Sequence, residues 1–491
     1  MYDEARSSEA AGDREKAIAD YKIIVAARPD LAEAFANLGR LEYEVRRPNE
    51  AVQSLRKAAT LKPGLAGPHF YLGIIAFERH NNSEAIGHLR TAIQVGPGDA
   101  ISFRYLGIAY YSSGQVREAA RYFDRAFQLG DTDPNLLYFM SKNYARLAED
   151  FFESLVNQYP QSPYRNLAWA HVREAQGQWE QAGNAYSRAQ EAMPASEGLR
   201  RKLDWIRAKI LHPSEAGPPP RTDPLVEGSL AVVYFPPPPA EIAKIIGDLA
   251  KEAQPPLARS PISGSDRELY TRGETDQTLS YLTALMVMVN RPESYRAYEL
   301  QAQMLEIGEE DDAALKAYGK AVEIEPHDPD LHFAIGRLHW KHQQFASAAA
   351  AMQQGLRLEP AYALGLFVLA DSQLHMNQLQ EAEQNFIRAT EVSPSFAQAY
   401  VRLEGMYTAA GKYDKSLAQL RKAMVADPSD PAPHYRSAVV MRKMGREAEA
   451  QEELKKFQLL SQQEKEKWHS TLTDEAAHPW LAGANNTSSL H

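Results

Sequence analysis

The sequence predicts an all-α protein, an α-solenoid of stacked helical hairpins in two arrays joined by a proline-rich insert. Two observations predict it: prolines recur at steps of 34 residues, and the same frame of small and large apolar residues precedes each of them. The chain has 491 residues, which suits two or three globular domains or one elongated repeat array. The repeat therefore decides the fold class.

The prolines mark the end of each repeat. Proline lacks the backbone N–H that a continuing helix needs, so each one stops the helix before it. The step of 34 holds inside each of three blocks, which are Pro29, Pro63 and Pro97; Pro160 and Pro194; and Pro292, Pro326, Pro360, Pro394 and Pro428.

Each repeat contains two helices. The helix before the proline carries small and large residues at helical spacing, as in Ala51, Leu55 and Ala58. An earlier helix carries a large residue followed by leucine and a small residue, as in Phe35-x-x-Leu38-Gly39. One hairpin cannot bury its apolar face alone, so we expect identical hairpins to stack and cover one another. The aromatic residues of this frame are accordingly expected to pack in the core.

This frame resembles the tetratricopeptide repeat family, with its W-x2-L-G-x2-Y, A-x3-F and P pattern. The resemblance implies a right-handed superhelix, with one array over residues 1–211 and a second over residues 264–470. It implies little about a specific function, because the family is a scaffold that serves many partners.

The register breaks once in each array. Pro97 and Pro160 are 63 residues apart, so one hairpin is five residues short, and residues 137–162 lack the usual turn glycine. We expect one long or kinked helix there. A similar segment follows 132 residues later, at 269–294, which suggests that a whole array was duplicated.

Residues 212–263 form the insert, and 12 of the 30 prolines lie between 213 and 261. Residues 230–235 suggest a short strand, and residues 240–252 an amphipathic helix whose apolar face needs a partner surface. Three interpretations stay open: the insert caps the first array and tethers the second, it lies in a groove, or it docks a foreign module. After a charged capping helix, we expect residues 471–491 to be a disordered tail.

Composition excludes several classes of protein. The formal charge is −10, and the acidity lies in the second half, where residues 265–491 carry 23 Lys+Arg against 32 Asp+Glu. Without a basic stripe we expect no nucleic-acid ligand. The longest apolar run, around residues 281–289, is far shorter than the roughly 20 residues that span a bilayer, so we expect no membrane insertion. Zero cysteines exclude disulfides and thiolate chemistry.

Catalytic motifs are missing from the sequence. It contains no GxxxxGK[ST], GxSxG, HExxH or glycine-rich dinucleotide loop, so we expect no enzyme activity, no cofactor and no metal. His332 and His339 fall on large-residue positions of a helix, which favours packing over metal binding. Glu404 stands where other repeats have Gly or Ala. A buried carboxylate there either needs a partner such as an arginine or has a raised pKa, and we expect a local adjustment in which Gly405 takes over the close contact.

The family resemblance also implies candidate binding residues. In tetratricopeptide repeats the first helix of each hairpin lines a groove, and fixed positions of that helix face a bound peptide. Those positions hold aromatic residues and arginines, the types that dominate binding hot spots. They are Arg40, Tyr43, Phe70, Tyr71, Phe77, Arg104, Tyr105 and Tyr111 in the first array, and Phe333, Arg337, Trp340, Phe367, Arg402, Tyr435, Arg436 and Arg442 in the second.

These observations favour a non-enzymatic scaffold that binds peptide segments or protein surfaces. For the second array we expect a ligand that combines apolar side chains with carboxylates. The asparagine ladder of the O-linked N-acetylglucosamine transferase array and the Lys/Asn/Arg clamp of chaperone-tail binders are both missing. The alternatives are a self-assembling structural protein, or a non-catalytic subunit of an enzyme or export complex.

The identity of the partner and the oligomeric state stay open, and so does the compartment. We expect a soluble, cytoplasmic protein by default. A periplasmic or exported one is the expectation if the N-terminus has been trimmed, because Met1 falls where the fourth residue of a first helix should be.

Overall fold

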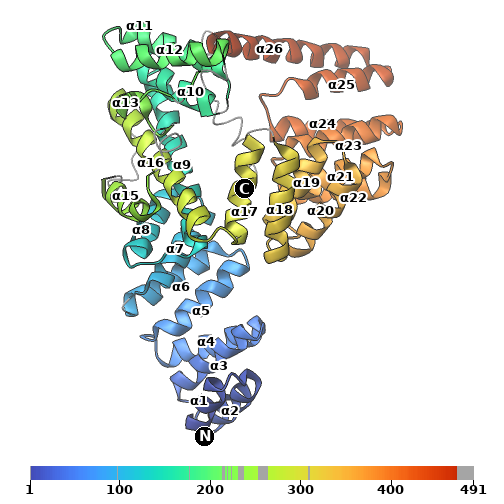
Figure 1. Cartoon of the computed structure of the whole chain (residues 1–491). Helices are drawn as coiled ribbons and strands as arrows, with labels where there is room; N and C mark the ends of the chain where they lie inside the picture. The colour runs from blue at the N-terminus through green and yellow to red at the C-terminus, as the bar shows by residue number, and fades with distance from the viewer. Residues whose placement is uncertain are drawn as a thin grey trace. The chain divides into compact units, whose positions relative to one another are not determined.

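The computed structural model describes residues 2–96, 98–175, 177–212, 216–217, 219–222, 224–230, 237–252, 264–307 and 310–472. Within these ranges every regular element is a helix, which confirms the predicted fold class. The chain divides into two compact units (Figure 1): unit 1 is Met1–Pro160 with Arg221–Asn290, and unit 2 is Gln161–Pro220 with Arg291–His491. The predicted strand at 230–235 falls almost wholly, and the predicted tail at 471–491 mostly, outside the described residues.

Unit 1 begins with four hairpins in which consecutive helices pair. Each helix that precedes a described repeat proline ends two residues before it, as α2 does before Pro29 and α4 before Pro63. The hairpins are α1 (Tyr2–Ala10) with α2 (Arg14–Ala27), α3 (Ala32–Glu44) with α4 (Pro48–Leu61), α5 (Ala66–Glu78) with α6 (Asn82–Val95), and α7 (Ala100–Ser112) with α8 (Val116–Gln128).

Small residues at the hairpin contacts let the two helices approach closely. A Cβ added to Gly39 would lie 2.6 Å from Leu55 Cγ, and one added to Gly107 would lie 2.5 Å from Phe123 Cδ1. Both large partners are fully buried. The small-large frame of the sequence is therefore the packing contact of each hairpin.

Two long helices form where the register breaks. They are α9 (Pro134–Gln158) and α16 (Asp266–Asn290), each of 25 residues. The helices pack against each other and run antiparallel, since Ser141 lies beside Ser280 while Tyr159 donates to the carbonyl of Gly264. The two segments that resemble each other in sequence thus take the same helical form, as the duplication hypothesis requires.

The amphipathic helix of the insert also belongs to unit 1. This helix, α15 (Pro239–Glu252), packs against α16 and α8, and it buries Ile242, Ile246 and Ala250. A single turn, α13 (Pro224–Glu227), precedes it. The described part of the insert therefore packs within unit 1, against α16 and against α8 of the predicted first array, and the three interpretations of the insert stay open. The grouping of α16 with unit 1 differs from the predicted boundaries at 211 and 264, which stay predictions.

Unit 2 contains the remaining helices. After α10 (Pro163–Ala175), α11 (Trp179–Ala192) and α12 (Glu197–Leu211), it continues with five hairpins. These are α17 (Tyr295–Ile307) with α18 (Asp311–Ile324), α19 (Pro329–Lys341) with α20 (Phe345–Leu358), α21 (Ala363–His375) with α22 (Leu379–Val392), α23 (Ala397–Ala409) with α24 (Tyr413–Ala426), and α25 (Ala432–Lys443) with α26 (Glu447–Leu472).

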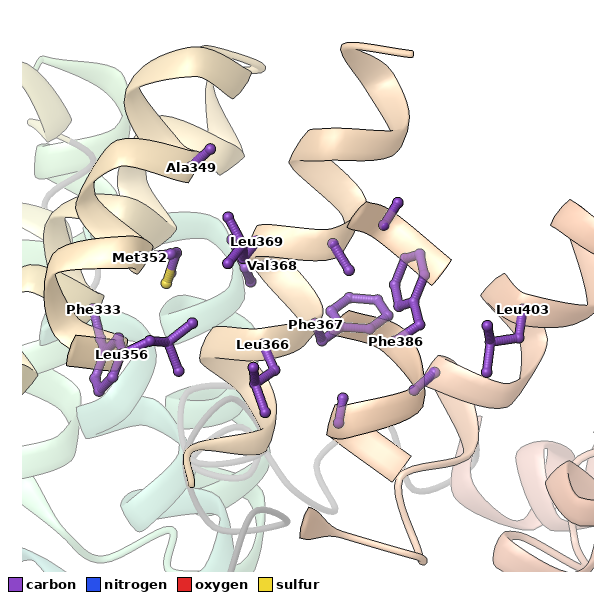
Figure 2. Packing of buried hydrophobic residues seen from close by; sticks show 14 of the residues in the cluster. Phe333, Ala349, Met352, Leu356, Leu366, Phe367, Val368, Leu369, Phe386 and Leu403 are labelled. Atoms are coloured by element: carbon purple, nitrogen blue, oxygen red, sulfur yellow. The ribbon is translucent and has the colours of Figure 1, made fainter. Parts of the chain in front are cut away.

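The core of unit 2 continues from hairpin to hairpin. Figure 2 shows Phe367 beside Phe386, whose ring centroids are 5.6 Å apart, with Leu366 and Leu403 in the same layer. The cluster takes buried residues from α19 through α23, so each hairpin covers the next. This is the stacking that the repeat predicts.

Candidate functional site

The first helices of neighbouring repeats contact one another in both units, as α3 contacts α5, α5 contacts α7 and α19 contacts α21. We call the face that they share the first-helix surface. It carries the candidate binding residues, and its composition differs between the units.

In unit 1 four partly buried aromatic side chains form a continuous row, which we call the aromatic ladder: Tyr43 on α3, Phe70 and Tyr71 on α5, and Tyr105 on α7. The ring centroids of Tyr43 and Tyr71 are 5.6 Å apart. Phe70 meets Tyr71 at 5.2 Å and Tyr105 at 5.8 Å, both nearly edge to face. The sequence placed these residues on one face, and the structure brings them into contact.

Two hydroxyl groups of the aromatic ladder are unpaired. Tyr43 donates to Glu78 Oε1 at 2.5 Å, whereas the hydroxyls of Tyr71 and Tyr105 have no hydrogen-bond partner in the part of the chain that the structure describes. Burial raises the pKa of both Tyr71 and Tyr105. Both therefore keep their protons at neutral pH and can donate to a ligand.

The predicted arginines beside the ladder are both engaged. Arg40 Nη1 donates to Glu44 Oε1 at 2.6 Å and its Nη2 pairs with Glu9. Arg104 Nη1 lies 2.5 Å from Asp133 Oδ2, and its Nε lies 3.4 Å from Asp131. Phe77 is partly buried, and Tyr111 packs on Phe139 of α9 with ring centroids 5.7 Å apart.

In unit 2 the same surface carries ion pairs between successive first helices, which we call the ion-pair ladder. Arg337 Nη2 lies 2.6 Å from Glu306 Oε2, Arg402 Nε lies 3.0 Å from Asp371 Oδ1, and Arg436 Nη1 lies 2.9 Å from Glu404 Oε2. Trp340 Nε1 also donates to Asp371, at 2.8 Å. The carboxylates of Asp371 and Glu404 are buried, while the side chains of Arg402 and Arg436 are each 46% exposed.

Glu404 has an arginine partner, Arg436, which is one of the two alternatives that the sequence left open for a buried carboxylate. Thr408 adds a hydrogen bond to Glu404 Oε1 at 2.8 Å, and Ser416 lies on the facing helix where other repeats have alanine. The expected compensation by Gly405 is wrong, because a Cβ at Gly405 would meet nothing within 4 Å. The glutamate fits because serine, threonine and arginine surround it.

The remaining candidates of unit 2 divide into buried and exposed residues. Phe333 and Phe367 are only 5% and 4% exposed and belong to the core cluster, so they present no surface to a peptide. Tyr435 is 50% exposed and packs on Phe457 of α26. Arg442 pairs with Glu447 of its own hairpin at 3.3 Å. The peptide-binding role of these residues stays a prediction.

Sequence reasoning missed the acidic partners Glu306 and Asp371. A signal was present: a carboxylate precedes each paired arginine by about one repeat, 31 residues for Glu306–Arg337 and Asp371–Arg402 and 32 for Glu404–Arg436. Glu9 and Arg40 repeat this spacing in unit 1. Equivalent positions of adjacent first helices lie side by side, so this spacing indicates an ion pair.

The described residues include no group of three or more His, Asp or Glu side chains arranged to hold a metal ion. Nor does any described helix combine the length and apolarity that a membrane crossing requires.

Comparison with known proteins supports the repeat. A sequence model of the tetratricopeptide repeat matches residues 2–66, 72–134, 333–386 and 367–431. No curated protein sequence matches the chain.

Three of the similar solved structures illustrate the range of the matches. The APC/C hetero-tetramer Cut9-Hcn1 is 13% identical, with 93% of this chain and 92% of that chain covered and a TM-score of 0.33. YrrB, a TPR protein with an unusual peptide-binding site, is 19% identical over 38% of this chain and 97% of its own, with a TM-score of 0.33. MamA 41-end from Desulfovibrio magneticus RS-1 is 18% identical over 34% of this chain and 96% of its own, also with a TM-score of 0.33.

Proposed function

Since this chain is a multi-repeat tetratricopeptide protein, we propose that it is a non-enzymatic scaffold that binds peptide segments or protein surfaces on its first-helix surfaces. Repeat arrays of this kind present a large, preformed surface, and preformed surfaces lose little entropy on binding.

Arg402 is the observation that carries this proposal. Its Nε lies 3.0 Å from the buried Asp371 Oδ1, an ion pair that keeps the guanidinium at this surface, and its two terminal amino groups have no partner among the described residues. Those two amino groups can donate two parallel hydrogen bonds to one carboxylate. Arg436 also pairs with a buried carboxylate one hairpin later, but through its Nη1 on Glu404, so only one of its two terminal amino groups is left for a ligand.

Aromatic side chains flank these arginines. Trp340 is partly buried and its indole is fixed by Asp371, while Tyr435 is half-exposed next to Arg436. The ligand proposed for unit 2 is therefore an extended segment that combines carboxylates with apolar or aromatic side chains.

The test is a peptide-array screen of random short peptides with the full chain. We expect enrichment of peptides that contain both carboxylates and aromatic residues, and loss of that enrichment in the double variant Arg402→Lys and Arg436→Lys. Lysine keeps a positive charge beside Asp371 and Glu404, but it lacks the planar guanidinium group that donates two hydrogen bonds to one carboxylate.

Arg357→Lys is the matched control, because Arg357 is exposed on a second helix, α20. Enrichment that has no acidic component, or that is the same in the double variant and in the control, would overturn the proposal for unit 2.

A further inference from the structure

We propose that the aromatic ladder of unit 1 binds a proline-rich segment in the polyproline II conformation. This inference rests on the proposed peptide-binding function and names the ligand class for one of the two surfaces. Three properties of the ladder lead to it: its charge balance, its free hydrogen-bond donors, and its spacing.

The charges around the ladder are balanced. Both oxygens of Glu44 are occupied, by Arg40 Nη1 at 2.6 Å and Arg14 Nε at 3.1 Å, and Arg104 is held by two aspartates. The Arg40 and Arg104 side chains are only 23% and 13% exposed, against 46% for Arg402. A charged ligand would have to break existing pairs, so charge complementarity favours a neutral segment.

The aromatic ladder offers hydrogen-bond donors to a ligand. The hydroxyls of Tyr71 and Tyr105 point to no acceptor in the described residues, whereas the nearby carboxylates of Glu44 and Glu78 already accept hydrogen bonds. A matching ligand supplies acceptors and few donors. Proline-rich segments have this chemistry, because each proline keeps its carbonyl oxygen and lacks the N–H.

The geometry suits the same ligand. Phe70 meets Tyr71 and Tyr105 nearly edge to face, so the ladder presents closely spaced aromatic rings, the type of surface on which proline-rich segments dock. Packed helices lie about 8 to 10 Å apart, and one turn of polyproline II advances about 9 Å along its axis. A polyproline II segment that crosses α3, α5 and α7 therefore meets each helix with the same face.

The experiment is an isothermal titration of the full chain with a capped oligoproline peptide, against a glycine-serine peptide of equal length. The double variant Tyr71→Phe and Tyr105→Phe removes only the two hydroxyls. We expect the oligoproline affinity of this variant to fall by about five- to tenfold for each hydrogen bond lost. Tyr413→Phe, which removes a hydroxyl on the second helix α24 of unit 2, is the matched control and should leave the oligoproline affinity unchanged.

Oligoproline that fails to bind at millimolar concentration, that binds no better than the glycine-serine peptide, or that binds the double variant as well as the unmodified chain would overturn the inference. Circular dichroism and the melting temperature of each variant show that it is folded. Binding of acidic aromatic peptides through Arg402 is measured separately. Its persistence without oligoproline binding would refute this inference alone, and its loss as well would refute the proposed function.

Discussion

The aromatic ladder and the ion-pair ladder occupy the same positions of the repeat and have different chemistry. Tyr71 and Tyr105 in unit 1 are equivalent to Arg402 and Arg436 in unit 2, each being the sixth residue of its frame. In unit 1 the hydroxyls of Tyr71 and Tyr105 have no hydrogen-bond partner among the described residues, while that of Tyr43 donates to Glu78. In unit 2 each arginine is tied to a buried carboxylate of the preceding repeat. One scaffold can thus carry two surfaces of different chemistry, because residues such as Tyr71 and Arg402 lie outside the small-large contact that forms each hairpin.

The largest effect that separates the two surfaces is expected for Arg402→Glu. Replacement by a carboxylate leaves the buried Asp371 beside a like charge. Breaking a fully buried pair costs about 3 to 5 kcal/mol, and since Arg402 is half-exposed we expect a loss of about 2 to 3 kcal/mol in the free energy of unfolding. Urea denaturation measures this change in the free energy of unfolding.

The matched control is Arg357→Glu on α20, which removes an exposed arginine and should change stability by under about 0.5 kcal/mol. Equal stability of the two variants would mean that the ion-pair ladder contributes nothing.

Packing at the same small-residue position of the repeat differs between two hairpins, α7 with α8 in unit 1 and α19 with α20 in unit 2. Alanine at Gly107 would place Cβ 2.5 Å from the ring of Phe123, whereas alanine at Gly336 would lie 2.9 Å from the flexible end of Met352. We expect Gly107→Ala to destabilise by about 1 to 3 kcal/mol. Gly336→Ala should destabilise the protein less, because the flexible side chain of Met352 can readjust.

Gly87 provides the control for these two substitutions, since it lies in α6 with nothing within 4 Å of an added Cβ. Alanine there should stabilise by about 0.5 to 1 kcal/mol. Thermal unfolding of the three variants compares the sites. A loss of stability in Gly336→Ala as large as that in Gly107→Ala would contradict the expected difference in rigidity.

Acidification is expected to weaken unit 1 through a pair of histidines. His69 Nδ1 lies 3.3 Å from His88 Nδ1, and burial, followed by the neighbouring His69, lowers the pKa of His88. The folded protein therefore binds fewer protons than the unfolded chain near pH 6. The contribution of His88 to stability is present above the unfolded pKa of about 6.5 and is lost as pH falls toward the folded value.

His88→Gln should reduce the loss of stability between pH 7 and pH 5 in urea denaturation. The control His327→Gln removes an exposed histidine of unit 2 and should leave that loss as it is. A pH dependence that does not change in His88→Gln would show that the pair has no such effect.

The smallest effect concerns the hydroxyl groups of the ladder itself. Tyr43→Phe removes the hydrogen bond to Glu78, so we expect a loss of about 0.5 to 1.5 kcal/mol. Tyr71→Phe removes a hydroxyl that has no partner in the described chain, so stability should stay the same. Chemical denaturation of both variants tests whether the free hydroxyls are indeed reserved for a ligand, and an equal loss in the two would argue against it.

Much of the fold could be predicted from the sequence because a repeat encodes its contacts locally. The pairing of Gly39 with Leu55 and the end of each second helix two residues before its proline follow from a pattern that recurs every 34 residues. Prediction of the site was less complete. The frame indicated which residues share the first-helix surface, but it did not show that Phe333 and Phe367 turn into the core.

The sequence by itself determined the helical hairpins, their order, the break of the register before Pro160, and the unusual place of Glu404 in the repeat frame. The tertiary structure decided that α9 pairs with α16, that α15 packs on α8 and α16, and which polar groups of the two ladders are engaged or free. The physical reason is distance along the chain. Contacts between adjacent repeats recur at a fixed spacing and leave a periodic signal, whereas an apolar helix face can pack on any complementary surface and its sequence does not say which one.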